Sequence, residues 1–309
     1  MKKTTKTIHF LIRIFNLESF LIALFIRTSN KIIKKLIPLH TSYMHPSIKK
    51  VVRDSTLFEL DISDYMQWYI WAGLKDLSWK FSTKDAKSPY TIIDVGANVG
   101  AFCLKTGAFL VNNNIDSTVI AFEPNPYVFK KLAKNLSLNE KLKNTVQVEP
   151  LGVSNKKEKL EFQWNKNNSG GGRFISKKDS ANENIELIKV VTIDDYVKAN
   201  NISNISFIKV DVEGFEPFVL QGAKETIEKF NPNIFIEVSP KWWNNNGFTV
   251  KGVLQHFNEL NYTFYPLIDE EIGTPETLHN ITQKKEQFNL FLSCNQDIIS
   301  IIEKDNWKN

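Results

Sequence analysis

The sequence predicts an α/β fold built on a doubly wound, mostly parallel sheet of Rossmann-like type. From Tyr90 onward, short runs rich in β-branched and aromatic residues alternate with segments of helical pattern, which is typical of βα units. The first run leads directly into a turn punctuated by glycines and then a helix, as in sheets that bind ligands at the carboxyl ends of their strands. We therefore expect a seven-stranded sheet.

The expected elements follow one another in a regular order. Pro126 opens the second helix, where a missing N–H does no harm because the first turn of a helix has no acceptor for it. Strands are expected at residues 91–95, 118–122, 145–148, 205–210, 233–238, 262–267 and 288–294, and the clearest helices at residues 101–111, 126–139 and 217–230.

Residues 160–191 interrupt this alternation. We expect an antiparallel hairpin or insertion there, with the glycine-rich segment 167–173 at its tip. Such excursions are where a scaffold often specialises. The tip could form a mobile lid in which Arg173 contacts an anionic or polyhydroxylated group, or it could be an ordinary hairpin loop.

The positive charge of the chain is concentrated near its N-terminus. Residues 1–40 contain eight Lys or Arg and one acid, a net charge of +7, whereas the other 269 residues contain 31 Lys or Arg and 33 acids, a net charge of −2. A nucleic-acid-binding protein would carry basic residues along its folded domain. We therefore expect no nucleic-acid partner.

Residues 1–54 are expected to form a basic, partly amphipathic helical preamble to a main domain at residues 55–309. The apolar run at residues 20–26 is too short to span a bilayer, and no signal-peptide cleavage site follows it. The preamble could lie on an anionic membrane surface, or it could pack its apolar face on the main domain. Cys103 and Cys294 form neither a disulfide framework nor a zinc motif, so we expect a cytoplasmic location, either free or peripheral at a membrane surface.

The strongest functional signal lies at residues 94–100, Asp-Val-Gly-Ala-Asn-Val-Gly, between the first strand and its helix. Gly96 permits a tight turn and Gly100 a close helix start, while Asp94 and Asn98 offer hydrogen bonds to a ligand. The dinucleotide fingerprint needs three glycines, and this turn has two, which disfavours a pyrophosphate ligand.

A second signal is Glu123, which ends the second predicted strand 27 residues after Gly96. A carboxylate in this place can accept hydrogen bonds from both ribose hydroxyls of a nucleoside. The alternative is an acidic residue that favourably precedes a helix N-terminus. Together with the turn, Glu123 suggests a nucleoside ligand without phosphate.

Five motifs in order resemble the FkbM family of methyltransferases. The resemblance covers about residues 55–240 and rests on DVGANVG at 94–100, FEPN at 122–125, TIDD at 192–195, KVDVEGFE at 209–216 and IEV at 236–238. It implies a class I methyltransferase fold, S-adenosylmethionine as the cofactor, and most often methylation of a hydroxyl on a sugar, glycolipid or other small metabolite.

The resemblance also implies roles for individual residues. The donor would be held by Asp94, Gly96, Asn98, Gly100, Glu123 and Asn125, and the acceptor would be faced by the carboxylates of Asp211, Glu213 and Glu237. Methyl transfer to an alcohol requires removal of its proton, so one of these carboxylates could act as general base, with Asp211 the first choice. Glu213 could instead cap a helix and Glu237 could be structural. No metal is expected, although three carboxylates could bind a divalent cation.

Other interpretations remain open at this stage. The chain could be a catalytically silent binding or membrane-associated partner protein, or an NAD-dependent oxidoreductase, although the missing glycine weakens the latter. The indoles of Trp242 and Trp243 could stack on a sugar or pack in the core.

Overall fold

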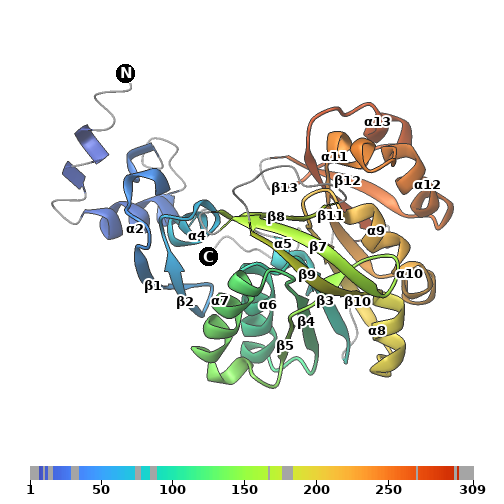
Figure 1. Ribbon diagram of the computed structural model, residues 1–309, viewed down its shortest axis with the longest axis horizontal. Helices are drawn as coiled ribbons and strands as arrows, with labels where there is room; N and C mark the ends of the chain where they lie inside the picture. Colours follow the sequence, from blue (N-terminus) through green and yellow to red (C-terminus); the bar gives the residue numbers. More distant parts are fainter. Residues whose placement is uncertain are drawn as a thin grey trace.

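The computed structural model describes residues 7–9, 11–12, 17–28, 35–73, 78–83, 89–165, 168–175, 184–268, 271–295 and 298. Within them, a large sheet forms the centre of the molecule and a smaller N-terminal unit extends to one side (Figure 1). The large sheet has the spatial order β13-β12-β14-β11-β10-β3-β4-β5.

The large sheet confirms the predicted α/β class. Its strands from β5 to β11 run parallel, whereas β14 inserts antiparallel between β11 and β12. Seven strands match the predicted ones to within one residue at each end, and the two-residue β13 is an addition at the edge. The bounds are β3 Thr91–Val95, β4 Thr118–Phe122, β5 Val146–Glu149, β10 Ile205–Val210, β11 Asn233–Val238, β12 Thr263–Ile268, β13 Glu271–Ile272 and β14 Phe288–Ser293.

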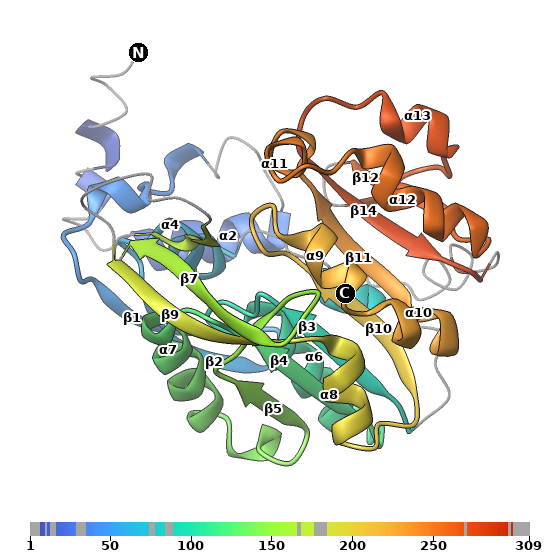
Figure 2. The same cartoon turned by 45° about the vertical axis from the view of Figure 1, so that its right-hand side comes forward.

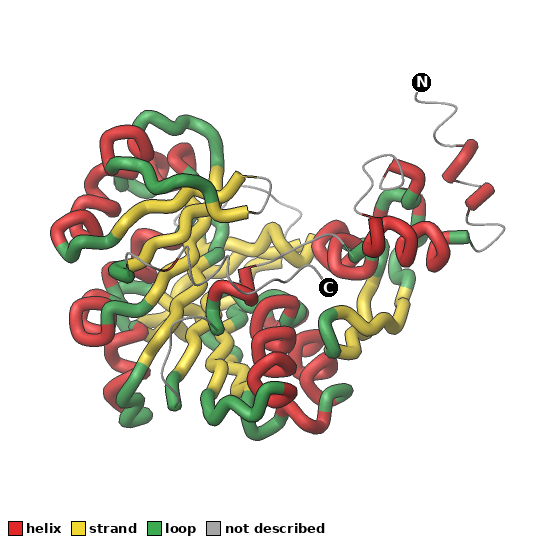
Figure 3. Tube along the Cα trace, turned by 180° about the vertical axis from the view of Figure 1, so that it is seen from behind, coloured by secondary structure: helices red, strands yellow, loops and turns green. Residues whose placement is uncertain are grey.

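Helices cover both faces of the sheet (Figure 3). Successive residues of a strand point to opposite faces, and because both sets are apolar here, each face needs a layer of helices to bury it. Ile92 packs in the cluster that contains the apolar residues of α6 and α7, whereas Ile93 packs with those of α8, α9, α10 and α12. The bounds are α6 Ala101–Asn112, α7 Pro126–Ser137, α8 Ile193–Ala199, α9 Glu216–Gln221, α10 Lys224–Phe230, α11 Pro240–Asn245, α12 Val250–Glu259 and α13 Leu278–Thr282, with a 3-10 turn at Glu140–Leu142.

The strand order reverses next to β3. The chain passes from β3 to β4 on one side and later places β10 on the other side. A crevice opens at such a reversal, at the carboxyl ends of the strands, because the flanking connections diverge. This is where the sequence places its strongest motifs.

The single helix predicted at residues 217–230 is two helices, α9 and α10. The break lies at Gly222, where a Cβ would stand 2.1 Å from the backbone oxygen of Ser154. The Gly222 carbonyl also accepts a hydrogen bond from the Asp194 amide at 2.9 Å. This close approach between distant segments ends α9, and no local pattern announces it.

The insertion at residues 160–191 is antiparallel, as expected, but its glycines are not at the tip. It belongs to a second sheet of order β6-β9-β7-β8, in which β7 pairs with both β8 and β9 (Figure 2). Gly170 and Gly172 lie inside β8, where added Cβ atoms would press on Met66 and Phe162 at 2.8 and 2.6 Å. The glycines therefore let the strand lie close to its neighbours. The bounds are β6 Gly152–Val153, β7 Glu158–Asn165, β8 Asn168–Phe174 and β9 Asn184–Val191.

The preamble expected to be helical to residue 54 ends in a strand. The hairpin formed by β1 (Ile48–Arg53) and β2 (Thr56–Asp61) crosses the predicted boundary at 54/55. The unit also contains α2 (Glu18–Thr28), a 3-10 turn at His40–Ser42 and α4 (Tyr65–Trp71), whereas α5 (Ser78–Phe81) packs on α6 and β14 of the main domain. No helix among the described residues is both long and apolar enough to cross a bilayer. Most of the basic side chains of residues 1–40 lie outside the described ranges.

Candidate functional site

A cleft of about 120 Å³ lies at the carboxyl ends of β3, β4 and β10. Its floor comes from the β3–α6 turn and the end of β4, and β8 covers it with Ser169, Gly170 and Gly172. Phe122, Phe162 and other apolar side chains form part of the wall. The cleft therefore coincides with the crevice that the strand order creates.

The β3–α6 turn approaches β10 because it carries glycine where no side chain fits. Gly96 has a φ of 87°, and a Cβ there would lie 1.9 Å from the backbone oxygen of Asp211. Gly100, with a φ of 97°, packs against Leu104 and Leu132, as its predicted role in the helix start requires. Two glycines thus bring the motif of the first strand against that of the fourth.

Glu123 links the turns on either side of the cleft. Its carboxylate oxygens accept hydrogen bonds from the backbone amides of Asn98 and Asn125, both at 2.8 Å. Burial raises the pKa of Glu123 to about 7, and these two hydrogen bonds only partly oppose that shift. Because Glu123 also lines the cleft, it can both organise the site and accept from a ligand hydroxyl.

Asn125 contributes a buried hydrogen-bond donor, its side-chain nitrogen, to the cleft. Its side-chain oxygen caps α7 by accepting from the amides of Tyr127 and Val128 at 3.0 and 3.3 Å. Its side-chain nitrogen is buried and has no hydrogen-bond partner in the protein. A buried donor without a partner is destabilising unless a ligand or water satisfies it. Asn125 therefore points to a polar ligand in this cleft.

Asp94 lies behind the cleft wall and not on it. It is fully buried, and the Nζ atom of Lys209 lies 3.8 Å from its Oδ1 atom. The same Nζ donates to Oδ2 of Asp211 at 2.9 Å. Lys209 thus connects the carboxylates of Asp94 and Asp211. We did not single it out from the sequence, although a lysine inside an apolar parallel strand needs a buried partner and is a detectable signal.

The three predicted acceptor-side carboxylates gather beyond Lys209. Asp211 and Glu213 line the cleft, and Glu237 lies close enough to both for their charges to affect it. Burial, followed by repulsion from Asp211 and Glu213, raises the pKa of Glu237 to about 8; its Oε2 atom is buried without a hydrogen bond. Loss of hydration and repulsion by Asp211 and Glu216 raise the pKa of Glu213 to about 7. No group of three His, Cys, Asp or Glu within the described ranges could hold a metal ion.

The buried carboxylate of Glu216 holds the backbone turn that follows β10. It is fully buried and accepts from the amides of Val212 and Gly214, both at 3.0 Å. It also accepts from Nε1 of Trp243 at 2.8 Å. Glu216 therefore fixes the turn that carries Glu213, a role that the sequence did not reveal.

Trp242 and Trp243 lie in different environments. Trp243 is fully buried, so of the two interpretations that the sequence left open, packing in the core is the one that holds for this residue. Trp242 is half-buried, and the guanidinium of Arg173 lies 5.0 Å from its ring centre. Arg173 also acts on Glu213 by its charge, which opposes the rise in the pKa of Glu213, so the two side chains lie near each other.

A comparison with known protein families decides the affiliation of the chain. Residues 94–264 match the family described as the methyltransferase FkbM domain. The chain belongs to this family. The matched region begins at Asp94 and includes β8, β10 and β11, so the FkbM domain contains the whole cleft apart from Met66.

Individual relatives are more distant. The chain is 28% identical over 148 residues to the hexuronic acid methyltransferase AglP of Haloferax volcanii, a match that covers 48% of this chain and 56% of that protein. It is 26% identical over 173 residues to the methyltransferase sdnD of Sordaria araneosa, covering 47% and 65% of the two chains. A crystal structure of an FkbM methyltransferase from Methylobacillus flagellatus shares 18% identity, with a TM-score of 0.41 and coverage of 69% of this chain and 47% of that one.

Proposed function

We propose that the protein is an S-adenosylmethionine-dependent methyltransferase that methylates a hydroxyl of a sugar-containing acceptor. The observation that carries the proposal is the cleft at the strand reversal, where Glu123 and the unpartnered amide of Asn125 face a largely apolar space. Membership of the FkbM family supports methyl transfer. The name of AglP, a hexuronic acid methyltransferase, supports a sugar acceptor.

The residues of the cleft fit this cofactor. Glu123 would accept from ribose hydroxyls, Asn125 would donate through its buried amide, and the aromatic walls would enclose the adenine. The cleft volume of about 120 Å³ is smaller than the roughly 300 Å³ at the lower end of ligand pockets. We therefore propose that the cover formed by Met66 and β8 moves outward when the donor enters.

S-adenosylmethionine supplies an activated methyl group on a sulfonium, so the chain has to position the acceptor and remove its proton. We propose that Asp211 accepts this proton, because it lines the cleft and Lys209 fixes the position of its carboxylate. Glu213 lies beside it, and Glu237 lies behind the cleft lining. Arg173, stacked on Trp242, would contact polar groups of the acceptor.

The proposal is tested by titrating the purified protein with S-adenosylhomocysteine and with NAD in a calorimeter. We expect binding of the former and none of the latter. Glu123→Gln should weaken binding about tenfold, because charge-assisted hydrogen bonds to the ribose are lost. Glu149→Gln is the matched control: Glu149 ends the neighbouring strand β5, does not line the cleft, and accepts from Tyr196 at 2.9 Å.

The proposed base is tested by the same titration together with an assay of methyl transfer. Asp211→Asn should keep its affinity for S-adenosylhomocysteine within about twofold and lose about a hundredfold or more in methyl transfer to hexuronic acid glycosides. Binding of NAD without binding of S-adenosylhomocysteine would contradict the proposed function. Unchanged turnover in Asp211→Asn would remove only the role of this residue.

A further inference from the structure

Exposed apolar side chains are distributed very unevenly over the described part of the chain. There, 11 of the 13 exposed large hydrophobic residues lie between Ile8 and Met66, and only Leu187 and Ile268 lie elsewhere. Scattered single apolar residues are normal on a protein surface, whereas a concentration of them marks a binding surface. The N-terminal unit is therefore the candidate.

The exposed residues of this unit belong to elements that contact one another. In α2, Ile22 packs into the core while Phe20 is 66% exposed on the helix surface. Tyr43, next to Met44, donates to Glu18 of α2 at 3.0 Å. We call Leu39, Met44, Tyr65 and Met66 the N-terminal apolar surface.

This surface reaches the mouth of the cleft. The ring of His40, which follows Leu39, lies 5.3 Å from that of Tyr65. Met66, the next residue, is 37% exposed and also lines the cleft. A partner bound to the N-terminal apolar surface would therefore lie beside the entrance to the proposed acceptor site.

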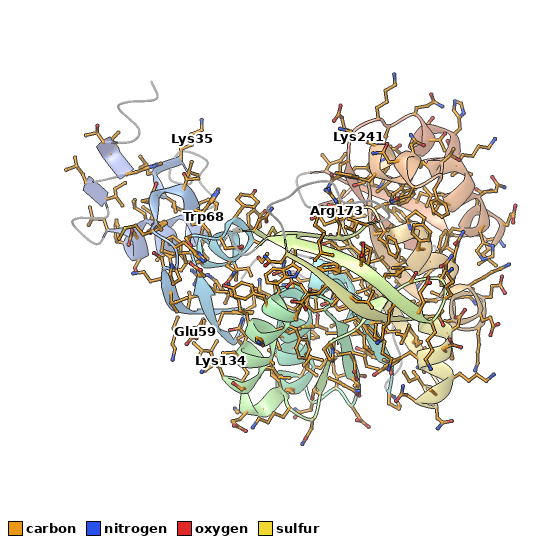
Figure 4. All side chains as sticks on the ribbon, in the orientation of Figure 1. Lys35, Glu59, Trp68, Lys134, Arg173 and Lys241 are labelled. Atoms are coloured by element: carbon orange, nitrogen blue, oxygen red, sulfur yellow. The ribbon has the colours of Figure 1, made fainter. Side chains whose placement is uncertain are left out.

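The charge of the same segment identifies the kind of partner. Residues 1–53 contain eleven Lys or Arg and a single acid, Glu18, a net charge of +10, whereas the rest of the chain has 28 Lys or Arg and 33 acids, a net charge of −5. Among the described basic residues, Lys35 lies exposed on the N-terminal unit (Figure 4). Exposed apolar side chains combined with basic residues are the features of a helix-containing segment that binds an anionic lipid surface.

We propose that the N-terminal apolar surface binds the surface of an anionic bilayer and holds the cleft mouth near the lipid headgroups. The apolar side chains would enter the interface between headgroups and acyl chains, and the basic residues would lie among the headgroups. A second copy of this chain is a poorer partner, since two segments of charge +10 would repel each other.

The experiment is sedimentation of the full-length protein with vesicles, one set containing phosphatidylglycerol and phosphatidylcholine and the other phosphatidylcholine alone. We expect binding to the anionic vesicles and release at high salt, where charges are screened. The double variant Leu39→Ser, Met44→Ser should lower the partition coefficient about tenfold or more, because two apolar contacts with lipid are lost. The matched control is Leu187→Ser, Ile268→Ser, which changes residues 61% and 65% exposed on the main domain and should bind as the unaltered protein does.

Three outcomes would overturn the proposal: no binding to anionic vesicles, equal binding to both vesicle types, or an equal loss in the two double variants. A dimer in solution that dissociates in the Leu39→Ser, Met44→Ser variant, without vesicle binding, would also overturn it. The measurement needs neither donor nor acceptor, so its result is independent of the proposed function.

Discussion

Lys209 shows how a single residue connects the two halves of the site. Its ammonium group is buried at the end of β10, 3.8 Å from a carboxylate oxygen of the fully buried Asp94 and 2.9 Å from one of Asp211. The ring of Phe102 lies 6.0 Å from it and excludes water. A charged carboxylate that is buried without a nearby cation is strongly destabilising. The ammonium group of Lys209 therefore offsets the cost of burying Asp94 under the β3–α6 turn.

This arrangement predicts a large effect of Lys209→Met on stability. The substitution removes the buried positive charge that faces Asp94 and Asp211, which should lower the free energy of unfolding by about 3 kcal/mol. Lys105→Met is the control, because Lys105 is equally buried but its partner Asp54, at 3.1 Å, is 43% exposed and can be hydrated by water. Urea denaturation should show a loss of about 1 kcal/mol or less for the control. Equal losses in the two variants would show that Lys209 does not neutralise Asp94.

At the scale of elements, the site depends on the contact between two strand ends. The β3–α6 turn and the end of β10 are about 115 residues apart in sequence, yet Gly96 touches the backbone of Asp211. The contact places Glu123 and Asn98 on one side of the cleft and the carboxylates of Asp211 and Glu213 on the other. A change in the spacing of these strand ends would misalign the proposed donor and acceptor sites.

Gly96→Ala should therefore disrupt the site. Two effects combine: a left-handed φ of 87°, which disfavours any side chain by about 1 kcal/mol, and a Cβ placed 1.9 Å from the Asp211 oxygen. Gly247→Ala isolates the first effect, because Gly247 has a φ of 83° and no atom within 4 Å of its Cβ position. We expect Gly247→Ala to lose about 1 kcal/mol of stability, and Gly96→Ala to lose about 3 kcal/mol or more together with detectable binding of S-adenosylhomocysteine. If calorimetry and denaturation found the two variants alike, the close approach would be unimportant.

The same elements show what the sequence could and could not predict. The seven main strands and the helices α6 and α7 were found to within about two residues because their signals are local: apolar runs, glycine turns and Pro126. The break at Gly222 and the glycine-containing strand β8 depend on contacts with Ser154 and Met66, which are distant in sequence. The role of Glu216 was missed for the same reason, since Trp243 is its partner only in the fold.

At the scale of the whole molecule, hydrogen bonds hold the N-terminal unit against the main domain and beside the cleft. The side-chain oxygens of Asn135 and Asn139, in and just after α7, accept hydrogen bonds from the backbone amides of Glu59 and Leu57 at 2.8 and 2.9 Å. These backbone amides on the free edge of β2 thus find their hydrogen-bond partners in the main domain. Asp64 caps α4 and accepts from the Ser169 hydroxyl at 2.7 Å. Movement of the proposed cover therefore involves both units, and contact of the N-terminal unit with lipid would affect the cleft through α4 and β8.

The buried acids of the site also govern how the stability of the whole molecule responds to pH. Glu123, Glu216 and Glu237 all have a pKa raised above the usual 4.5 because burial disfavours their charged forms. Between about pH 5 and pH 8 the folded protein therefore binds more protons than the unfolded chain, so these groups stabilise the fold below the ordinary Glu pKa and lose that contribution as the pH rises through about 7 to 8. Burial acts to raise the pKa of Asp61, but hydrogen bonds from Ser63 and Ser47 outweigh it and lower this pKa. The contribution of Asp61 to the stability of the fold is therefore lost as the pH falls below about 4.

We thus expect the free energy of unfolding, measured with urea at a series of pH values, to increase as the pH is lowered from about 8 to about 5. The pKa of Glu123 rises from 4.5 to about 7, which at about 1.4 kcal/mol for each pH unit gives a contribution of about 3 kcal/mol. Glu123→Gln cannot titrate, so its stability should vary less over this range than that of the unaltered protein. Stability that rises with pH in this interval would mean that the acids of the cleft are ionised and satisfied in the folded state, because only then would folding favour their deprotonation.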